Sequence, residues 1–341
     1  MSQCSPCRLA AAPHCGAFML RVLRFLPVLL GAALAAPALP AQNDAALASR
    51  LQTMLAGFKG QVSFYARDLA TGREVAINAD EPVPTASVIK LGVLYEALEQ
   101  VREGRVSLAD RLTYRREDQV PGSGVLLFFD TPATITFKDA LTLMIALSDN
   151  TAANLSMDHV GIRNVDERLA ALGLSNTWLY KKVFTPNDGA PMPADQKKFG
   201  LGKTTAREMG SLMERFADCR LGPPPAASSP AGPFPRPQVP GDQALCDAAM
   251  HMLKVQFYRD CIPRYLEGAG APAGITGIAN KTGSLDRVRN DVGAVFTKRG
   301  TIILSAFTHD NADTSWTADN SAELLIAGMA RAVVAAWTSG N

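Results

Sequence analysis

Strand-like patterns lie near the two ends of this 341-residue chain, and a long region of helical patterns separates them. Apolar residues alternate with polar ones over 62–66 and again, after a turn, over 75–77, which predicts a β-hairpin. Three further strands are predicted close to the other end, over 278–281, 291–296 and 301–308. Strands from both ends therefore fit one antiparallel sheet, with the helical middle as an inserted all-helical lobe.

Apolar residues recur at helical spacing through the middle of the chain and beside both groups of strands. This spacing predicts helices over 42–58, from 85 or 87 to 101, and over 134–147, 151–160, 164–172, 205–216, 244–257 and 322–337. Because 47% of the residues are hydrophobic, the chain can build a large core as one or two domains. The predicted fold class is α/β in the broad sense (α+β), an antiparallel sheet flanked by helices.

The first 41 residues have the features of an N-terminal extension and a signal peptide. A short basic region over 19–24 precedes an apolar run over 25–36, and small residues follow to position 41. The residues before Met19 do not resemble the start of a signal peptide, so either Met1 or Met19 is the true start. The apolar run is short for a membrane span. We therefore expect residues 42–341 to form an exported domain, periplasmic or secreted, without a stable membrane span.

Between residues 220 and 241 the composition shifts to proline, alanine, serine and glycine, which predicts a surface insertion. Three cysteines remain after signal cleavage: Cys219, Cys246 and Cys261. An oxidising compartment favours one disulfide among them, with the Cys219–Cys246 pair bracketing the insertion as one option, and leaves one thiol over. Their spacing does not match a zinc ligand set, so we expect no metal. The net charge of +2 gives no reason to expect nucleic acid as a partner.

The first turn of the helix that starts near residue 85 or 87 carries a serine and a lysine. Ser87 and Lys90 are three residues apart, which places them on one face of that turn. The hydroxyl lies among unpaired backbone N–H groups, where the helix dipole favours developing negative charge. A desolvated lysine beside it can lose its proton and act as a base toward the hydroxyl. Alone, the pattern is weak, since Ser87 could be a helix cap and Lys90 a surface residue.

Two more short motifs follow in order, and together with the first they form a specific set. They are Ser148-Asp149-Asn150, after a buried helical stretch, and Lys281-Thr282-Gly283-Ser284, on a predicted strand. The three motifs in this order are the set found in class A β-lactamases and penicillin-binding proteins. The chain therefore resembles a class A serine β-lactamase, or a related serine hydrolase, over nearly its whole mature part.

The resemblance implies a catalytic role for several motif residues. Ser87 would attack the lactam carbonyl and form an acyl-enzyme, and Lys90 would take its proton. Ser148 would hand a proton to the departing nitrogen, with the charge of Lys281 beside it. The backbone N–H groups of Ser87 and Ser284 would form the oxyanion hole. This covalent chemistry implies no cofactor.

The resemblance also implies a substrate-binding set. Asn150 would hydrogen-bond the side-chain amide of the substrate. Lys281, Thr282, Gly283 and Ser284 would lie along the substrate's carboxylate. An arginine that often assists this binding is not evident, and Arg287 or Arg289 is the candidate for that role.

One part of the class A pattern is missing. These enzymes carry a glutamate in the loop after the Ser-Asp-Asn helix, where it activates the water that releases the acyl group. No glutamate occurs from 178 to 206 in this chain, and Val183 or Phe184 falls in its place. Asp188 and Asp195 are shorter carboxylates, displaced by several residues. We therefore expect acylation to survive and fast release of the acyl group to be impaired.

The function predicted from these motifs is the opening of β-lactam rings through an acyl-enzyme on Ser87, with weak turnover. Two alternatives use the same acylation chemistry. One is a hydrolase of cell-wall D-alanyl peptides, similar to a carboxypeptidase, and the other is a penicillin-binding trap or sensor that releases its ligand slowly. In each case the ligand is a small molecule or a cell-wall peptide, and the protein is expected to be a monomer.

Overall fold

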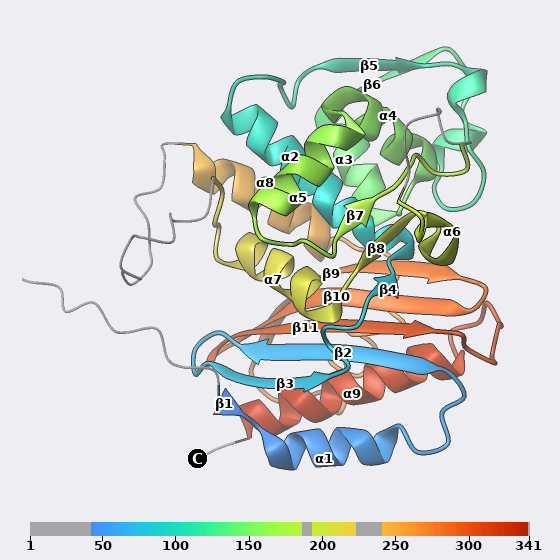
Figure 1. The fold of residues 1–341 in the computed structure, drawn as a ribbon. Coiled ribbons are helices and arrows are strands. Elements are labelled where there is room, and N and C mark those ends of the chain that lie inside the picture. Colours follow the sequence, from blue (N-terminus) through green and yellow to red (C-terminus); the bar gives the residue numbers. More distant parts are fainter. Residues whose placement is uncertain (1–41, 186–192, 223–240, 340–341) are drawn as a thin grey trace, which may run out of the picture. The chain divides into compact units, whose positions relative to one another are not determined.

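The computed structural model describes residues 42–185, 193–222 and 241–339 (Figure 1). The predicted signal peptide, Asp188 and almost all of the proline-rich insertion lie outside the described residues. The described residues all fall within one compact unit of the chain.

A six-stranded sheet joins the two ends of the domain (Figure 1). Its strands, in their order across the sheet, are β1 (Gln42–Asn43), β3 (Arg73–Ile77), β2 (Gln61–Asp68), β11 (Gly300–His309), β10 (Val288–Thr297) and β9 (Ile275–Leu285). All neighbours run antiparallel except β1 and β3, which are parallel. In the central pairing Asp68 lies opposite Ile302 and Gln61 opposite His309. The prediction of one antiparallel sheet built from both ends is confirmed.

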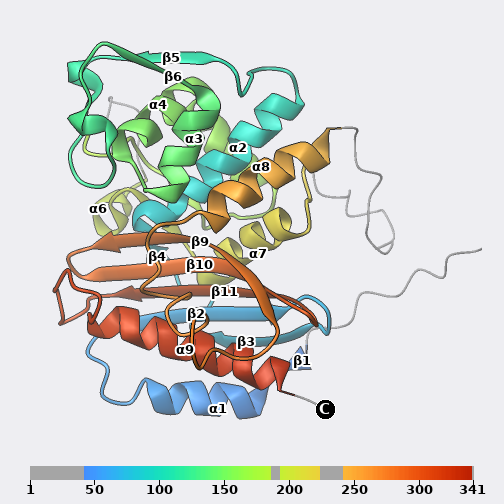
Figure 2. The ribbon, with the colours of Figure 1, turned by 180° about the vertical axis from the view of Figure 1, so that it is seen from behind.

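Helices cover both faces of the sheet. On one face lie α1 (Ala45–Met54) and the C-terminal α9 (Ser321–Thr338), as Figure 2 shows. Their buried side chains form one core with that face. The helix predicted from residue 42 begins later because the Asp44 carboxylate accepts a hydrogen bond from Leu47 N at 3.0 Å and caps α1.

The C-terminal helix α9 is apolar enough to raise the question of a membrane span. By length and composition Ser321–Thr338 could cross a membrane, and half of that window is buried in the domain. Ile326, Val333 and Trp337 belong to the core between α9 and the sheet. Packing against the sheet therefore accounts for the apolar side of this helix.

The opposite face of the sheet packs against α7 (Ala206–Ala217), α8 (Asp242–Lys254) and the helical lobe beyond them (Figures 1 and 2). The lobe contains α2 (Lys90–Arg102), α3 (Phe137–Ala146), α4 (Asn150–Val160) and α5 (Ile162–Ala171). The helix α2 runs through its middle, and eleven of its thirteen residues are buried. A second core forms around it. The motif that begins α2 is therefore held rigidly between the lobe and the sheet.

The lobe is not all-helical, contrary to the prediction. A hairpin of β5 (Arg111–Tyr114) and β6 (Ala133–Thr136) lies at its outer edge (Figure 1). A small sheet joins β4 (Val83–Pro84), β8 (Gly202–Thr204) and β7 (Trp178–Leu179). The structure also has α6 (Gln196–Phe199) and the 3₁₀ helices η1 (Ala86–Ile89), η2 (Arg116–Asp118) and η3 (Leu126–Phe128). These strands have two to four residues and few buried positions, too few to produce a visible alternation.

A disulfide closes the segment that carries the proline-rich insertion. Cys219 is bonded to Cys246, 27 residues further along the chain, and Cys261 is a free, buried thiol. Of the pairings that the three cysteines allow, the structure has the one that brackets the insertion.

Replacing Cys219 and Cys246 by serine should lower the free energy of unfolding by about 3–4 kcal/mol, because the unfolded chain then gains the freedom of a 27-residue loop. Urea unfolding followed by circular dichroism measures this change. The Cys261→Ala variant, which keeps the disulfide, serves as a control. A loss below about 1 kcal/mol would show that the bond adds little to stability.

Candidate active site

The nucleophile candidate Ser87 lies in η1, one turn before α2 begins at Lys90. The preceding residue, Ala86, has a φ of 44°, a left-handed conformation that costs a non-glycine residue energy. Asn290 on β10 donates its amide to the carbonyls of Pro84 at 2.9 Å and Thr85 at 3.2 Å. These bonds fix the strained turn to the sheet, and Ser87 is left partly exposed at the pocket.

Lys90 is fully buried directly behind this turn. Its ammonium donates to the carbonyl of Ser148 at 2.6 Å, to Ser148 Oγ at 3.2 Å and to Asn150 Oδ1 at 2.9 Å. Burial lowers the pKa of Lys90 well below its ordinary value, the nearby Lys281 lowers it further, and Asp149 acts in the opposite direction. The structure therefore places a lysine that loses its proton readily one helical turn after Ser87.

Ser148 lies between the two lysines. Its Oγ is 3.0 Å from Lys281 Nζ, and Lys281 also donates to the carbonyl of Thr282 at 2.7 Å. Burial lowers the pKa of Lys281 to about 7, while Asp291 on the neighbouring strand acts to raise it. One hydroxyl thus contacts both amines, an arrangement that can pass a proton between them. The structure brings together residues that are 58 and 133 positions apart in the chain.

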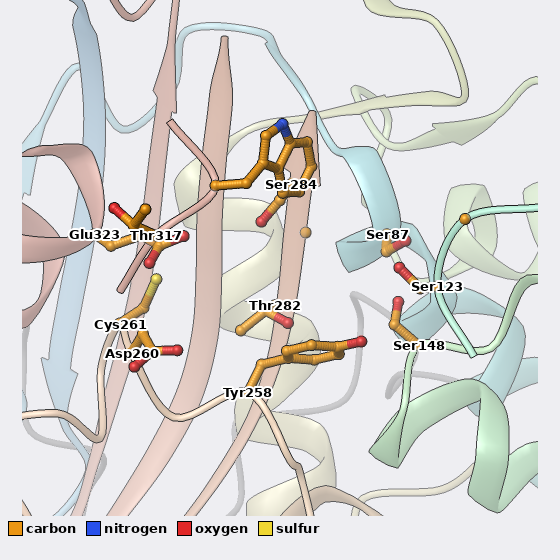
Figure 3. A pocket seen from close by; sticks show the side chains of 13 residues that line it. Ser87, Ser123, Ser148, Tyr258, Asp260, Cys261, Thr282, Ser284, Thr317 and Glu323 are labelled. Carbon is orange, nitrogen blue, oxygen red and sulfur yellow. The ribbon is translucent and has the colours of Figure 1, made fainter. Parts of the chain in front are cut away.

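Asp149 and Asn150 hold the loop over residues 123–126, on the side of the cavity opposite the sheet. Asp149 caps α4 through Ala152 N and also accepts hydrogen bonds from Val125 N at 2.6 Å and Leu126 N at 2.9 Å. The backbone N–H of Asn150 donates to the carbonyl of Ser123 at 3.0 Å. These bonds hold the Ser123 hydroxyl at the pocket, where Figure 3 shows it beside Ser87 and Ser148.

Gly283 allows β9 to lie directly against the nucleophile turn. A Cβ at this position would lie 2.7 Å from Thr85 O, 2.8 Å from Val88 N and 2.9 Å from Ser87 N. Backbone atoms cannot yield as a flexible side chain does. The strand that carries Thr282 and Ser284 is therefore close to Ser87 only because residue 283 has no side chain.

Changing Gly283 to alanine should push β9 away from the turn and slow acylation by about 10²-fold, the cost of weakening one oxyanion donor. The matched control is Gly277→Ala on the same strand, where the nearest atoms to a new Cβ are 3.9 Å away or more. Burst kinetics with a chromogenic β-lactam compare the two variants. Equal acylation rates in both would contradict this account of Gly283.

A cavity of about 520 Å³ opens at these residues (Figure 3). Of the predicted site residues, it is lined by Ser87, Ser148, Thr282, Gly283 and Ser284. Lys90, Lys281 and Asn150 lie buried next to it. The wall also contains residues that the motifs do not indicate: Gly122, Ser123, Tyr258, Asp260, Cys261, Trp316, Thr317 and Glu323. The glycines on either side of Ser123 were the one sequence signal for this part of the wall. The structure shows why Gly124 is needed, since it has a φ of 112° and a Cβ there would collide with Asp149.

The loop that lacks the glutamate is fixed to α4. Asn154 donates to the carbonyl of Val183 at 3.0 Å and accepts from Val183 N at 2.8 Å, both in buried surroundings. Val183 is buried, whereas the Phe184 side chain is 67% exposed. Asp195, the substitute carboxylate that the structure describes, is bound to Tyr180 Oη at 2.8 Å and Lys203 Nζ at 2.7 Å and does not line the cavity.

Neither arginine proposed to assist carboxylate binding lines the cavity. Arg289 is fully buried and forms an ion pair with Glu323 at 3.0 Å, and it also donates to the carbonyls of Leu285, Val288 and Ser315. Arg287 is exposed and donates to the carbonyl of Asp310 at 3.1 Å. The Arg289 guanidinium is already occupied by protein acceptors, which speaks against the role suggested for it.

Comparison with known proteins places this chain in a family. A family model described as "Beta-lactamase enzyme family" matches residues 46–229 and 241–337. The chain belongs to this family. The predicted resemblance to class A serine β-lactamases is confirmed, and with it the fold class.

Solved structures and one curated relative give the extent of the likeness. The β-lactamase from Sphaerobacter thermophilus DSM 20745 is 28% identical with a TM-score of 0.68, over 85% of this chain and 96% of that one. A mutant of PBP-A in an acyl-enzyme complex with penicillin G is 23% identical with a TM-score of 0.69, over 87% and 98% of the chains. The β-lactamase regulatory protein BlaB of Streptomyces cacaoi is 38% identical over 93 residues. That alignment spans 27% of this chain and 30% of the relative.

Proposed function

We propose that this family member is acylated by β-lactams on Ser87 and releases the acyl group slowly. The observation that carries the proposal is the Ser148 hydroxyl in contact with both Lys90 and Lys281, in the cavity that Ser87 lines. The fold itself supports such chemistry, since the PBP-A mutant of the same fold forms an acyl-enzyme with penicillin G.

The acylation step follows from the positions of these groups. Ser87 Oγ attacks the lactam carbonyl while neutral Lys90 accepts the hydroxyl proton. The ring C–N bond then breaks, and the departing nitrogen takes a proton from Ser148. Ser148 recovers a proton from the Lys90 ammonium at 3.2 Å, so the protons balance. Lys281 stays charged beside Ser148 and stabilises the negative charge that develops.

Slow release is proposed because Val183 or Phe184 stands in the sequence where class A enzymes have their glutamate. Neither side chain can activate water against the ester on Ser87. Among the described residues of this loop, Asp195 is held in an ion pair with Lys203. The same acylation machinery would serve a hydrolase of D-alanyl peptides, so the ligand and the release rate decide between the candidates.

We also propose that the domain is exported, to the periplasm or the medium. The support is the apolar segment over 25–36 in the sequence and the Cys219–Cys246 disulfide, a bond that persists in oxidising compartments.

The acylation rate should pass through a maximum with pH and fall on the alkaline side near pH 7. Lys90 acts as a base only when neutral, and burial together with the Lys281 charge favours that form. Lys281 contributes only when charged, and its pKa is about 7, so its contribution is lost as the pH rises through 7. Burst rates between pH 5 and 9 test this profile. Arginine at position 281 stays charged, so the Lys281→Arg variant should lose the alkaline fall, and a flat profile in the unmodified protein would contradict the assignment.

Stopped-flow kinetics with nitrocefin, on protein beginning at Gln42, test the function. A burst of one equivalent followed by slow turnover, both absent from Ser87→Ala, supports the proposal. Fast steady turnover would mean that another group replaces the missing glutamate. Release of D-alanine from a D-alanyl-D-alanine peptide, without a β-lactam burst, would favour the peptide hydrolase.

A further inference from the structure

The cavity has a second end with a different chemistry. Figure 3 shows Ser87, Ser123 and Ser148 at one end, and Asp260, Cys261, Thr317 and Glu323 gathered at the other. Thr282 and Tyr258 lie between the two groups. A ligand that is bound to Ser87 and extends past Thr282 therefore meets the carboxylates of Asp260 and Glu323.

This end carries more negative than positive charge. Glu323 is paired with Arg289 at 3.0 Å, and the guanidinium also donates to three backbone carbonyls. Asp260 is exposed and has no ion-pair partner within the described ranges. Burial raises the pKa of Glu323, Arg289 lowers it and Asp260 raises it, so the two carboxylates interact.

The other cations close in the chain are already paired. Arg259 forms an ion pair with Glu267 and donates to Asn280, and Arg264 forms an ion pair with Asp319 at 2.8 Å. Of these described cations, Arg289 alone pairs with a carboxylate of the cavity wall, Glu323, and Asp260 is left without an ion-pair partner. A positive group on a ligand would complete the charge balance at this end.

Uncharged side chains at this end and beside it also suit a cation. The Trp316 ring is 66% exposed and stacks on Arg289 at 4.5 Å, and the Tyr258 ring is 41% exposed at the cavity wall. Aromatic faces attract ammonium and pyridinium groups. Cys261 is 4% exposed and lines this end, and its thiol has no hydrogen-bond partner in the part of the chain that the structure describes. A thiol sulfur is a weak acceptor, which an ammonium group of a ligand can contact.

We propose that this end is a subsite for a positively charged group next to the substrate's carboxylate. The inference rests on the proposed function, in which the carboxylate lies along Lys281, Thr282 and Ser284. A substituent beside that carboxylate then points past Thr282 toward Asp260 and Glu323. We call this substituent the arm of the substrate. The preferred substrates are β-lactams that carry an ammonium or pyridinium group on the arm.

Two cephalosporins test the subsite, because they share the thienylacetamido side chain and differ at the arm. Cephaloridine carries a pyridinium-methyl group there, and cephalothin carries a neutral acetoxymethyl group. The readout is the ratio of their second-order acylation rates, measured by quenched-flow intact mass spectrometry on the exported, processed protein. Because the two compounds differ in intrinsic reactivity, the ratio is compared between protein variants.

Asp260→Asn should lower the cephaloridine-to-cephalothin ratio by about fivefold, by slowing cephaloridine alone, the effect of one partly exposed charge pair. Asp286→Asn removes an equal charge from the exposed β9–β10 turn outside the cavity and should leave the ratio unchanged. A ratio unchanged in Asp260→Asn, or lowered equally in Asp286→Asn, would overturn the subsite. If neither compound forms an adduct on Ser87, the proposed function itself fails.

Discussion

Replacing Val183 by glutamate should raise the rate of acyl release by about 10²- to 10³-fold, the usual contribution of a positioned general base. Both backbone groups of Val183 are hydrogen-bonded to Asn154, at 2.8 and 3.0 Å. Asn154 lies one helical turn after Asn150, whose side chain contacts Lys90. A carboxylate at position 183 would therefore be carried by a backbone fixed to α4, the helix that begins at Asn150. Pre-steady-state kinetics with nitrocefin separate acylation from release.

The matched control is Phe184→Glu, which adds the same carboxylate one residue later. Phe184 is exposed and has a φ of 53°, so its side chain is not held by the core. Release should then change by less than tenfold. If Phe184→Glu accelerated release and Val183→Glu did not, residue 184 would be the true counterpart of the missing glutamate. Glutamate at 183 also buries a carboxyl group, so thermal unfolding of this variant is measured in parallel.

Lys90→Met should slow acylation of Ser87 by about 10³-fold, because the hydroxyl loses its proton acceptor and Ser148 loses one of its two amine contacts. The fold should survive, because methionine fills a similar volume. Burial, which lowers the pKa of Lys90, also makes a charged amine at this position costly to stability, and methionine removes that cost. Adduct formation on Ser87 over hours measures the rate, and thermal unfolding reports the stability.

An exposed lysine provides the control for Lys90→Met. Lys138 lies on the surface of α3, and Lys138→Met should leave acylation unchanged. If Lys90→Met acylated at the normal rate, the base would have to be another group, with Lys281 as the remaining amine in contact with Ser148.

The sequence was informative where local pattern and chain order decide the structure. Ser87 and Lys90 are close because they are three residues apart in a helical turn. The Ser148-Asp149-Asn150 motif follows the apolar helix α3, and the Lys281-Thr282-Gly283 motif lies within the strand β9. The patterns over 62–66 and 301–308 predicted strands that pair directly, β2 with β11. The strands β5 and β6 were missed because Tyr114 is their one fully buried residue, so burial leaves no alternation to read.

The acidic end of the cavity could not be predicted. Asp260 lies in a loop after α8. Trp316 comes from the segment that leads into α9 and Glu323 from the first turn of that helix, both more than fifty residues later. No motif or spacing connects them, and only the packing of the sheet against α9 brings them together. The contacts of Arg289 also come from distant parts of the chain, since its guanidinium donates to Glu323 and to the carbonyl of Ser315. Its sequence position suggested a role in ligand binding, whereas these contacts bind it to the protein itself.

The most direct measurement is intact mass spectrometry of the protein after mixing with benzylpenicillin, with Ser87→Ala treated in the same way. The account predicts one adduct with the mass of the intact antibiotic, mapped to Ser87 after proteolysis, persisting for minutes or longer and absent from Ser87→Ala. An adduct that remains in Ser87→Ala would contradict it. So would the absence of any adduct together with the absence of turnover.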